Sequence, residues 1–251
     1  MIEKRFKNRY NKIMRYLMIV QYNGLNFNGF QKQTDGNTIQ NHLENALKII
    51  LKEEISTVGS GRTDAKVSAF MQPVHFDTEK AIDTNKVLNS LNGILPSDIK
   101  VLSLIESNIH ARFDAKRKTY CYKMYVSSVD LPLYSNALRI SPNLDFKTMK
   151  KFLKLIVGTH DFKGFQASGS KTESSVRTIY SAKLKKENQY LNFYITGNGF
   201  LYKMVRNIVG TMLKIGEQKL DLKELKNTLF SSYRATNTAK PEYLFMMNVI
   251  Y

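Results

Sequence analysis

Apolar runs and helical periodicities alternate along the first hundred residues. Tyr16 to Tyr22 is a mainly apolar run of strand length that ends at Asn23-Gly24, so it predicts a buried strand. Thr38 is a good helix cap, and apolar residues then recur at helical spacing as far as Leu51. By the same criteria we predict strands over 55–58 and 71–76, a helix over 87–94 and a closing strand over 99–105.

The second half of the chain repeats this order of elements. We predict strands over 119–126, 176–184, 190–196 and 243–250, with helices over 149–156 and 200–215. The order β-α-β-β-α-β therefore occurs twice. It predicts an α+β fold of two split-βαβ units (ferredoxin-like or RRM-like), with antiparallel sheets side by side. Each unit would carry its helices on one face of its sheet and leave the other face free for a ligand.

These units divide the chain near its centre. Residues 15–108 form the predicted N-terminal α+β unit, and residues 109–251 form the predicted C-terminal unit. Residues 1–14 are a basic N-terminal extension, which could be an arm that grips a polyanion or a solvated tail.

Charge points to a class of partner. The formal net charge is +17 and the sequence pI is about 9.7, and such a field attracts polyanions. A general drift towards lysine is the alternative, but clustering of the basic residues favours a binding footprint. We therefore expect RNA in a cleft between the two units. The clusters are Lys4, Arg5, Lys7, Arg9, Lys12 and Arg15, and then Arg112, Lys116, Arg117, Lys118 and Lys123.

Other residue types exclude several classes of protein. No window approaches the roughly 20 apolar residues of a spanning helix, and the basic start lacks the apolar core of a signal peptide. We therefore expect a cytoplasmic protein with no membrane partner. The single cysteine, Cys121, excludes an internal disulfide. Since the histidines have no ligand spacing, we expect no metal; they are His42, His75, His110 and His160.

A short polar loop is the strongest candidate for chemistry. Gly59-Ser60-Gly61 leads into Arg62-Thr63-Asp64-Ala65 between two predicted strands. Small residues let a ligand approach the backbone closely, and Arg62 and Asp64 place opposite charges at the edge of the turn. A plain hairpin loop with a surface ion pair has the same composition, so the loop alone does not decide.

Two residues of the second half could join this loop. Arg206 lies near the start of the helix predicted over 200–215, after the turn Gly197-Asn198-Gly199 that permits close approach. It could equally be a boundary arginine with its stem on apolar surface. Tyr120 and Tyr122 alternate along a strand and should share a face, where a ring could pack in the core or stack on a base.

Seven segments, in order and at compatible spacing, together resemble the tRNA pseudouridine synthase A (TruA) family. The resemblance covers almost the whole chain after the basic N-terminus. The segments are Tyr22-Asn23-Gly24 with Gly29-Phe30-Gln31, Thr38-Ile39-Gln40, Gly61 to Ala65 with His75-Phe76-Asp77, His110 to Phe113 leading to Tyr120, Gly158 to Phe162, Val176 to Ile179, and Met204 to Gly210.

The resemblance implies an enzyme that isomerises uridine to pseudouridine in folded RNA without a cofactor. It places Asp64 at the position of the essential aspartate and Arg206 as the cation that keeps Asp64 charged. Tyr120 would stack on the target uracil and is the candidate base for its C5 proton. Asp64 could attack C1′ or C6, or act as a base at C2′.

Further residues are expected to contact the substrate. Arg62 would help to hold the target nucleotide out of its helix. We expect the other contacts from basic or polar residues in the same loop and near the start of the strand that carries Tyr120. They are Thr63, Lys66, Arg112, Lys116, Arg117 and Lys118.

Departures from the family pattern begin just after the aspartate. The family loop usually continues Asp-Ala-Gly-Val-His-Ala, whereas here Lys66 replaces the glycine and Ser68 replaces the histidine. If that glycine has positive φ, lysine carries strain of about 1 kcal/mol; otherwise Lys66 adds a phosphate contact. Phe30 stands where tryptophan is common.

We expect the substrate to be adjacent uridines of the tRNA anticodon arm and the enzyme to be a homodimer, because the family builds its RNA cleft across two subunits. Lys66 and Ser68 motivate one alternative, a diverged paralogue that modifies rRNA or another structured RNA. A non-catalytic RNA-binding module is the other, although it would gain nothing from a carboxylate facing phosphates.

Overall fold

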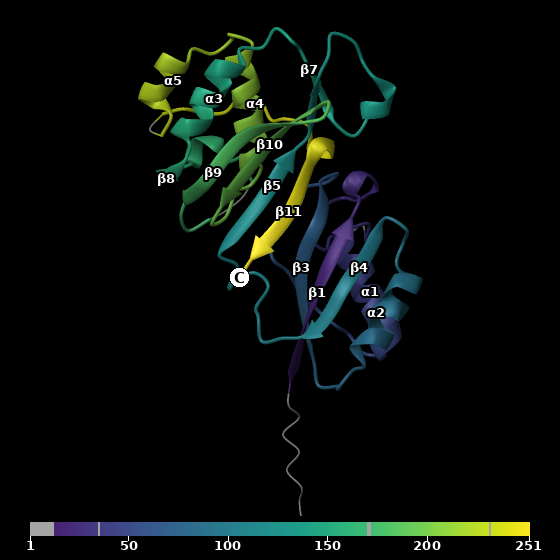
Figure 1. The fold of residues 1–251 in the computed structure, drawn as a ribbon. Coiled ribbons are helices and arrows are strands. Elements are labelled where there is room, and N and C mark those ends of the chain that lie inside the picture. The colour runs from purple at the N-terminus through teal and green to yellow at the C-terminus, as the bar shows by residue number, and fades with distance from the viewer. Residues whose placement is uncertain (1–12, 35, 170–171, 231) are drawn as a thin grey trace, which may run out of the picture.

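A computed structural model describes residues 13–34, 36–169, 172–230 and 232–251, and it has a mixed α+β fold with one large sheet (Figure 1). Residues 1–12, most of the predicted basic extension, lie outside the described residues. We call residues 13–108 the N-terminal half and residues 109–251 the C-terminal half. The N-terminal half contains β1 (Met14–Tyr22), α1 (Ile39–Leu51), β2 (Thr57–Gly59), β3 (Ser68–Thr78), α2 (Thr84–Ile94) and β4 (Ile99–Glu106).

Strands of the N-terminal half pair in the order β4-β1-β3, with β2 on the far edge of β3, and all of these pairs are antiparallel. Helix α1 begins where the Thr38 hydroxyl accepts the backbone N–H of Asn41. Its apolar stripe, which includes Leu43 and Leu47, is fully buried against the sheet. This packing fixes the connection between β1 and β2, and therefore the place where the loop after β2 starts.

The C-terminal half builds a second ladder in the order β11-β5-β10-β9-β8, with β6 on β10 and β7 on β6. Two of its short strands, Leu138–Ile140 and Gly158–Asp161, and its final helix, Leu222–Thr228, were not predicted from the sequence. Its elements are β5 (Arg117–Tyr122), β6 (Met124–Val126), β7 (Leu138–Ile140), α3 (Phe146–Leu155), β8 (Gly158–Asp161), β9 (Val176–Glu187), β10 (Tyr190–Gly197), α4 (Met204–Gly216), α5 (Leu222–Thr228) and β11 (Leu244–Ile250).

Two predicted boundaries are wrong for local reasons. The strand predicted over 119–126 is interrupted at Lys123, whose N–H donates to Tyr243 O and whose carbonyl accepts from Leu138 N. The helix predicted from Phe200 begins at Met204, because Lys203 before it has left-handed backbone angles (φ 56°). Arg206 is therefore in the first turn of α4.

The two ladders form one sheet, which corrects the prediction of two separate antiparallel sheets. Strand β11 pairs in parallel with the start of β3 through Phe245 opposite Ser68 and Met246 opposite Ala69. The later part of the same β3 edge pairs with β2, through Val74 and Phe76. The loop between β2 and β3 therefore begins and ends beside the junction of the two halves.

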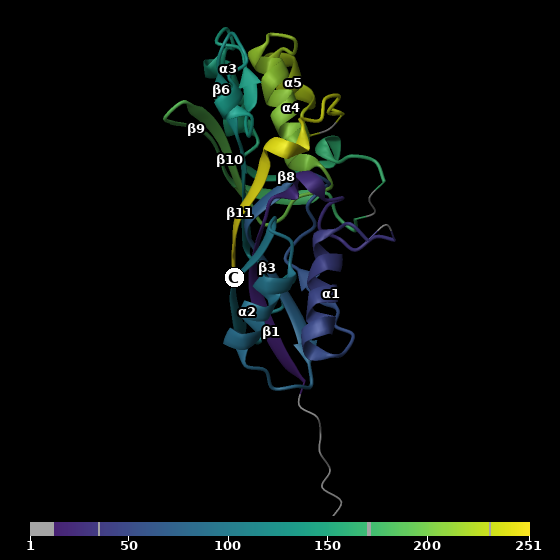
Figure 2. The same cartoon turned by 90° about the vertical axis from the view of Figure 1, so that its right-hand side faces the viewer.

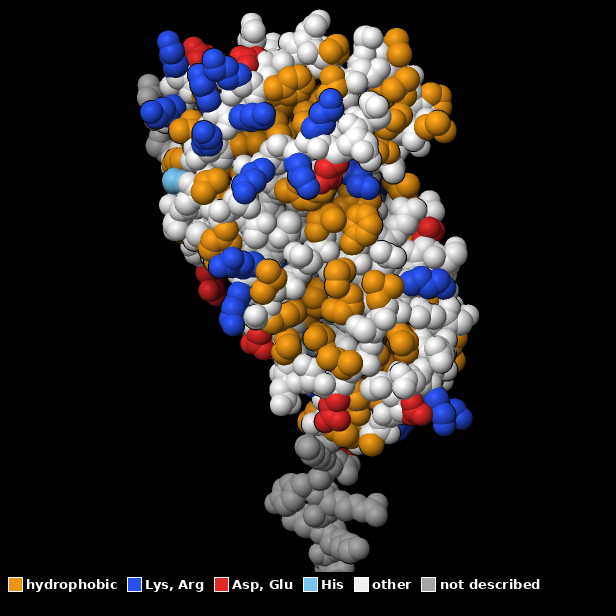
Figure 3. All heavy atoms as spheres, in the orientation of Figure 1, with side chains coloured by type: hydrophobic (Ala, Val, Ile, Leu, Met, Phe, Trp, Pro, Cys, Tyr) orange, Lys and Arg blue, Asp and Glu red, His pale blue; other side chains and the backbone are white. Residues whose placement is uncertain are grey.

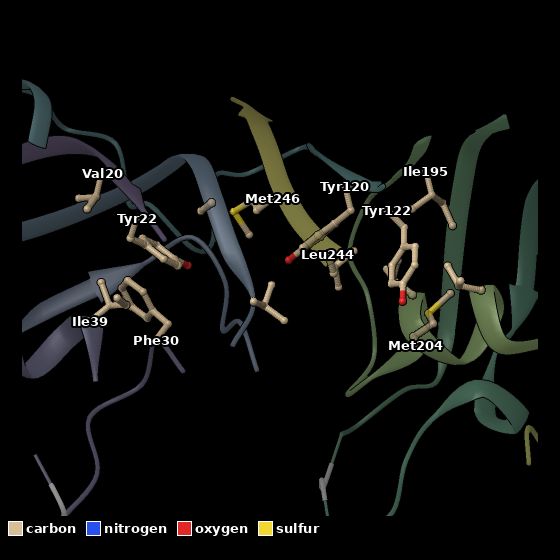
Figure 4. Close-up of a cluster of buried hydrophobic side chains, with 14 of the residues drawn as sticks. Val20, Tyr22, Phe30, Ile39, Tyr120, Tyr122, Ile195, Met204, Leu244 and Met246 are labelled. Atoms are coloured by element: carbon tan, nitrogen blue, oxygen red, sulfur yellow. The ribbon is translucent and has the colours of Figure 1, made fainter. Parts of the chain in front are cut away.

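Figure 2 shows α1 and α4 on the same side of the sheet, and the core lies on that side. Figure 4 shows Tyr22 and Tyr120 pointing from the two halves towards the space between them, with Tyr122 directed at Met204 of α4. All four side chains are at most 8% exposed. Tyr120 is therefore on the helix-bearing face, whereas the free face was the predicted ligand surface. Among the described residues, no helix is long and apolar enough to cross a membrane.

Candidate active site

The loop from Ser60 to Val67 joins β2 to β3 at the junction of the halves, and neighbouring backbone holds it on several sides. Ser60 N–H donates to Pro73 O at 2.9 Å, and Phe30 N–H donates to Thr63 O at 3.1 Å. Within the loop, Val67 N–H donates to Asp64 O at 3.1 Å. These bonds satisfy backbone groups directly and hold the backbone of Ser60, Thr63 and Asp64 in place.

Two glycines of the family motifs lie against this loop. A Cβ on Gly24 would stand 2.0 Å from Val67 O, and Gly29 (φ +97°) would place its Cβ 2.8 Å from Thr63 O. No side chain fits at either position. The Tyr22 hydroxyl also shares a 2.8 Å hydrogen bond with the Thr63 hydroxyl. The motifs around Tyr22 and Gly29 therefore form the wall on which the loop rests.

Asp64 and Arg206 form the ion pair that the resemblance implied. Arg206 Nη1 donates to Asp64 Oδ2 at 2.8 Å, although the residues are 142 positions apart. Arg206 Nε also donates to Ala239 O at 2.7 Å, which fixes the guanidinium from a second direction. The Asp64 side chain remains 20% exposed and that of Arg206 11%. The pair is therefore sheltered, but the carboxylate can still be reached.

Tyr120 lies beside this pair on β5. Its ring packs edge-on against Phe200, with the centroids 5.2 Å apart. Burial, followed by the nearby Tyr22 and Asp64, raises the pKa of the Tyr120 phenol above its ordinary value. The hydroxyl is therefore protonated at neutral pH and is able to donate.

Two polar side chains reach the first carbonyl groups of the loop. Gln72, fully buried on β3, donates its Nε2–H to Gly61 O at 2.7 Å and accepts from the Ser60 hydroxyl at 3.3 Å. Lys118 Nζ on β5 donates to Ser60 O. Burial, and to a smaller extent the charge of Arg112, lowers the pKa of Lys118 to about 8. Lys118 was predicted to contact substrate, but its ammonium group is directed at the protein's own loop.

The other predicted substrate contacts fall into two groups. Arg62, Lys66, Arg112 and Lys116 are exposed and available to a ligand, and Arg62 Nε also donates to Gln31 Oε1 at 3.0 Å. Thr63, in contrast, is 6% exposed and its hydroxyl is engaged by Tyr22.

Arg117 is not brought to the site. Successive side chains of a strand point to opposite faces, so Arg117 lies on the face of β5 away from Tyr120. Its guanidinium carbon lies 4.8 Å from the ring centroid of Tyr180 on β9. Arg117 is therefore separated from Asp64 by the sheet itself.

Lys66 and Ser68, the two departures from the family pattern, differ in their conformation and exposure. Lys66 has φ +67°, so it has the left-handed conformation in which glycine is favoured. Its N–H donates to Phe27 O at 3.2 Å, which holds it there. Ser68 is buried, and its hydroxyl accepts the Gly24 N–H at 3.0 Å. Lys66 thus carries the strain and remains exposed, whereas Ser68 joins the loop to the β1 end.

Sequence reasoning missed Gln72, Gln31 and Phe200 as members of this environment. Gln72 left a detectable signal, because it is a polar residue within the apolar run from Phe70 to Phe76. Gln31 and Phe200 contact the site through pairings between distant segments, and no local pattern reveals those. Among the described residues, no group of three or more histidine, cysteine, aspartate or glutamate side chains could hold a metal ion.

Comparisons with known proteins point to one family. A family model described as tRNA pseudouridine synthase matches residues 18–114 and 153–251. The tRNA pseudouridine synthase A of a Thermoanaerobacter species is 39% identical, covering 95% of this chain and 100% of its own. That of Acetivibrio thermocellus is 37% identical (93% and 98%), and that of Streptococcus mutans is 38% identical (95% and 99%).

Similarity to solved structures is weaker. A chain of a crystallised Cbf5-Nop10-Gar1 complex is 14% identical, with a TM-score of 0.38, and the match covers 92% of this chain and 48% of that one. A TM-score this low carries no argument about the fold. The family model covers most of the chain and the relatives cover nearly all of it, and both include the loop of Asp64 and the helix of Arg206. The chain belongs to the tRNA pseudouridine synthase family.

Proposed function

We propose that this protein isomerises uridine to pseudouridine in tRNA, with Asp64 as the catalytic carboxylate. The observation that carries the proposal is the sheltered Asp64–Arg206 ion pair, formed between the two halves beside Tyr120. A charged carboxylate with a fixed cation and an adjacent aromatic ring suits a reaction on a flipped-out base. The similarity to tRNA pseudouridine synthases supports the same assignment.

The reaction is an isomerisation, so substrate and product have the same atomic composition, although one hydrogen is exchanged. The uracil is detached from C1′ at N1, turned, and reattached through C5, while the proton on C5 is lost and N1 gains one. Asp64 can act as a nucleophile at C1′ or C6, or as a base at C2′. Arg206 places a fixed positive charge beside the carboxylate and holds it in one orientation for any of these routes.

Tyr120 is proposed to pack against the uracil and to handle the C5 proton. Because burial raises its pKa, the phenol is protonated at rest, so it can accept the C5 proton only while its own O–H proton passes to another base, such as the nearby Asp64 carboxylate. Arg62, Lys66, Arg112 and Lys116 are exposed cations and are proposed to contact phosphates around the target nucleotide.

We further propose adjacent uridines of the anticodon arm as the target, in an RNA cleft between two split-βαβ units over residues 15–108 and 109–251. A homodimer would extend this cleft across two subunits. The protein would act in the cytoplasm, where its tRNA substrate is found. The net charge of +17 supports capture of RNA but does not select among RNAs.

Tritium release tests the proposal. Wild-type protein incubated with tRNA carrying tritium at uracil C5 should release tritium, and Asp64→Ala should lower the rate at least about 1,000-fold. RNA affinity should persist in the variant, because a carboxylate contributes nothing attractive towards phosphates. Lack of release from any tRNA would refute the enzyme assignment. Pseudouridine mapping in cells with and without the protein would then identify the target, and loss from rRNA alone would favour the alternative substrate.

A further inference from the structure

We propose that Lys118 is a positioning residue: it fixes the Asp64 loop to the strand that carries Tyr120 and makes no contact with RNA. This rests on the proposed function and changes the role that the sequence predicted for Lys118. The geometry that supports it is the contact of Lys118 Nζ with Ser60 O, which joins the C-terminal half to the start of the loop.

This contact matters for the site because Lys118 lies on β5, the strand that also carries Tyr120. Lys118 and Tyr120 are two residues apart, so their side chains point to the same face of the sheet. Asp64 is four residues beyond Ser60 in a loop whose Gly61, Thr63 and Asp64 carbonyl groups all accept hydrogen bonds from the N-terminal half. Among the described residues, Lys118 is the side chain of β5 that bonds a carbonyl group of this loop. Together with the Asp64–Arg206 ion pair, this bond helps to set the separation between the Asp64 carboxylate and the Tyr120 ring.

The surroundings of the Lys118 ammonium group also favour a role within the protein rather than at its RNA surface. A Cβ added to Gly61 would lie 3.5 Å from Lys118 Nζ, so the amine rests against the loop backbone. Among the described residues, no acidic side chain forms an ion pair with Lys118, and the nearest charge that affects it is Arg112. A half-buried cation in such surroundings costs stability, and an apolar residue of similar size fits as well or better. A lysine at this position is explained if the loop needs a long side chain that donates a hydrogen bond to Ser60 O.

Gln72 performs the matching task from the other side. Its amide binds both Ser60 and Gly61 from within β3. The start of the loop is therefore held between a neutral donor of the N-terminal half and a charged donor of the C-terminal half. A shift of one half relative to the other would change the contact between Lys118 Nζ and Ser60 O.

Lys118→Met tests the proposal, with Lys116→Met as the matched control, because Lys116 is exposed and lies two residues earlier. For Lys118→Met we expect kcat on tRNA to fall about 10- to 100-fold. Its Kd for tRNA should stay within about twofold and its Tm should be unchanged or higher. For Lys116→Met, whose ammonium group is proposed to contact a phosphate, we expect a weaker Kd and a lower salt slope, which is the pattern that Lys118→Met should not show. Lys118→Arg, which keeps a long charged donor, should recover most of the lost kcat.

Hydrogen exchange gives a readout that does not depend on activity. Amides of residues 60–67 should exchange about 10-fold faster in Lys118→Met than in wild type, while those of α1 should not change. A weaker Kd together with a salt slope lower by about one would assign Lys118 to a phosphate and overturn the proposal. Unchanged kcat and unchanged exchange would overturn it as well. If wild-type protein lacked activity on any RNA, the proposed function would fail, and exchange would still decide the role of Lys118.

Discussion

The two halves of the sheet are built from similar ladders, yet they make different contributions to the site. The N-terminal half supplies the carboxylate and a loop held by neutral hydrogen bonds from Phe30, Tyr22 and Gln72. The C-terminal half supplies the guanidinium of Arg206 and the ammonium of Lys118. In the proposed mechanism neither half contains a complete site, so the alignment of the halves is itself required for catalysis.

Charge on the surface follows the same division. Figure 3 shows lysine and arginine side chains gathered over the C-terminal half, while apolar and uncharged side chains dominate the middle and the N-terminal half on this face. On this face, the positive potential is therefore strongest over the C-terminal half.

The largest effect should come from breaking the charge pair between the halves. Arg206→Gln leaves Asp64 without its cation, so we expect kcat to fall about 100-fold with little change in tRNA affinity, measured by tritium release and filter binding. Arg206→Lys keeps the charge but cannot bind both Asp64 and Ala239 O, so its loss should be about 10-fold. A loss of affinity at unchanged kcat would instead place Arg206 on an RNA phosphate.

The second expected effect is a loss of stability at low pH, caused by His75 where it holds the segment between β4 and β5. His75 on β3 is buried, and its Nδ1 accepts the Ala111 N–H at 3.0 Å. Burial, with the charges of Arg15 and His110, lowers the pKa of His75 from 6.5 to about 4. As pH falls from 6.5 to 4 the unfolded chain binds the proton first, so stability should fall through this window by about 2 kcal/mol.

Chemical unfolding at several pH values measures this loss. His75→Asn keeps an acceptor near Nδ1 but does not titrate, so its stability should change less between pH 6.5 and pH 4. The variant and wild type should have similar stability at pH 8. An equal loss in both proteins would show that His75 does not cause it.

The smallest expected effect is a gain in stability from replacing Lys66 in the loop of Asp64. Lys66 and Lys52 both have positive φ (67° and 54°), and Lys52 caps the end of α1, far from Asp64 along the chain. Replacing either by glycine should therefore raise the unfolding free energy by about 0.5–1 kcal/mol. Only Lys66→Gly should also weaken tRNA binding, because only Lys66 belongs to the loop of Asp64. Equal affinity in the two variants would exclude a phosphate contact by Lys66.

Local patterns predicted the elements well. The strand over Tyr16–Tyr22 and the helix that follows Thr38 appear where apolar spacing and a cap residue predicted them, because both signals act over a few residues. The short strands β7 and β8 and the helix α5 leave weak patterns, and they depend on partners elsewhere in the sheet or on α3.

Joining of the halves could not be predicted, because it rests on two residue pairs between β3 and β11, separated by about 177 positions. The sequence also did not predict on which face of the sheet each basic side chain lies. Arg117 and Lys118 are neighbours in one basic cluster, yet alternation along β5 sends one to Tyr180 and the other to Ser60. A basic cluster predicts a partner class, whereas the sheet decides which of its members face the site.

Strand β11 has a consequence for how the enzyme is made. It pairs with both β3 and β5, and it follows every other described element along the chain. A ribosome therefore completes the loop of Asp64 long before it releases the strand that joins the two halves. During that interval the nascent polypeptide carries its carboxylate without an assembled site, so tRNA molecules that crowd around a translating ribosome meet an inactive intermediate.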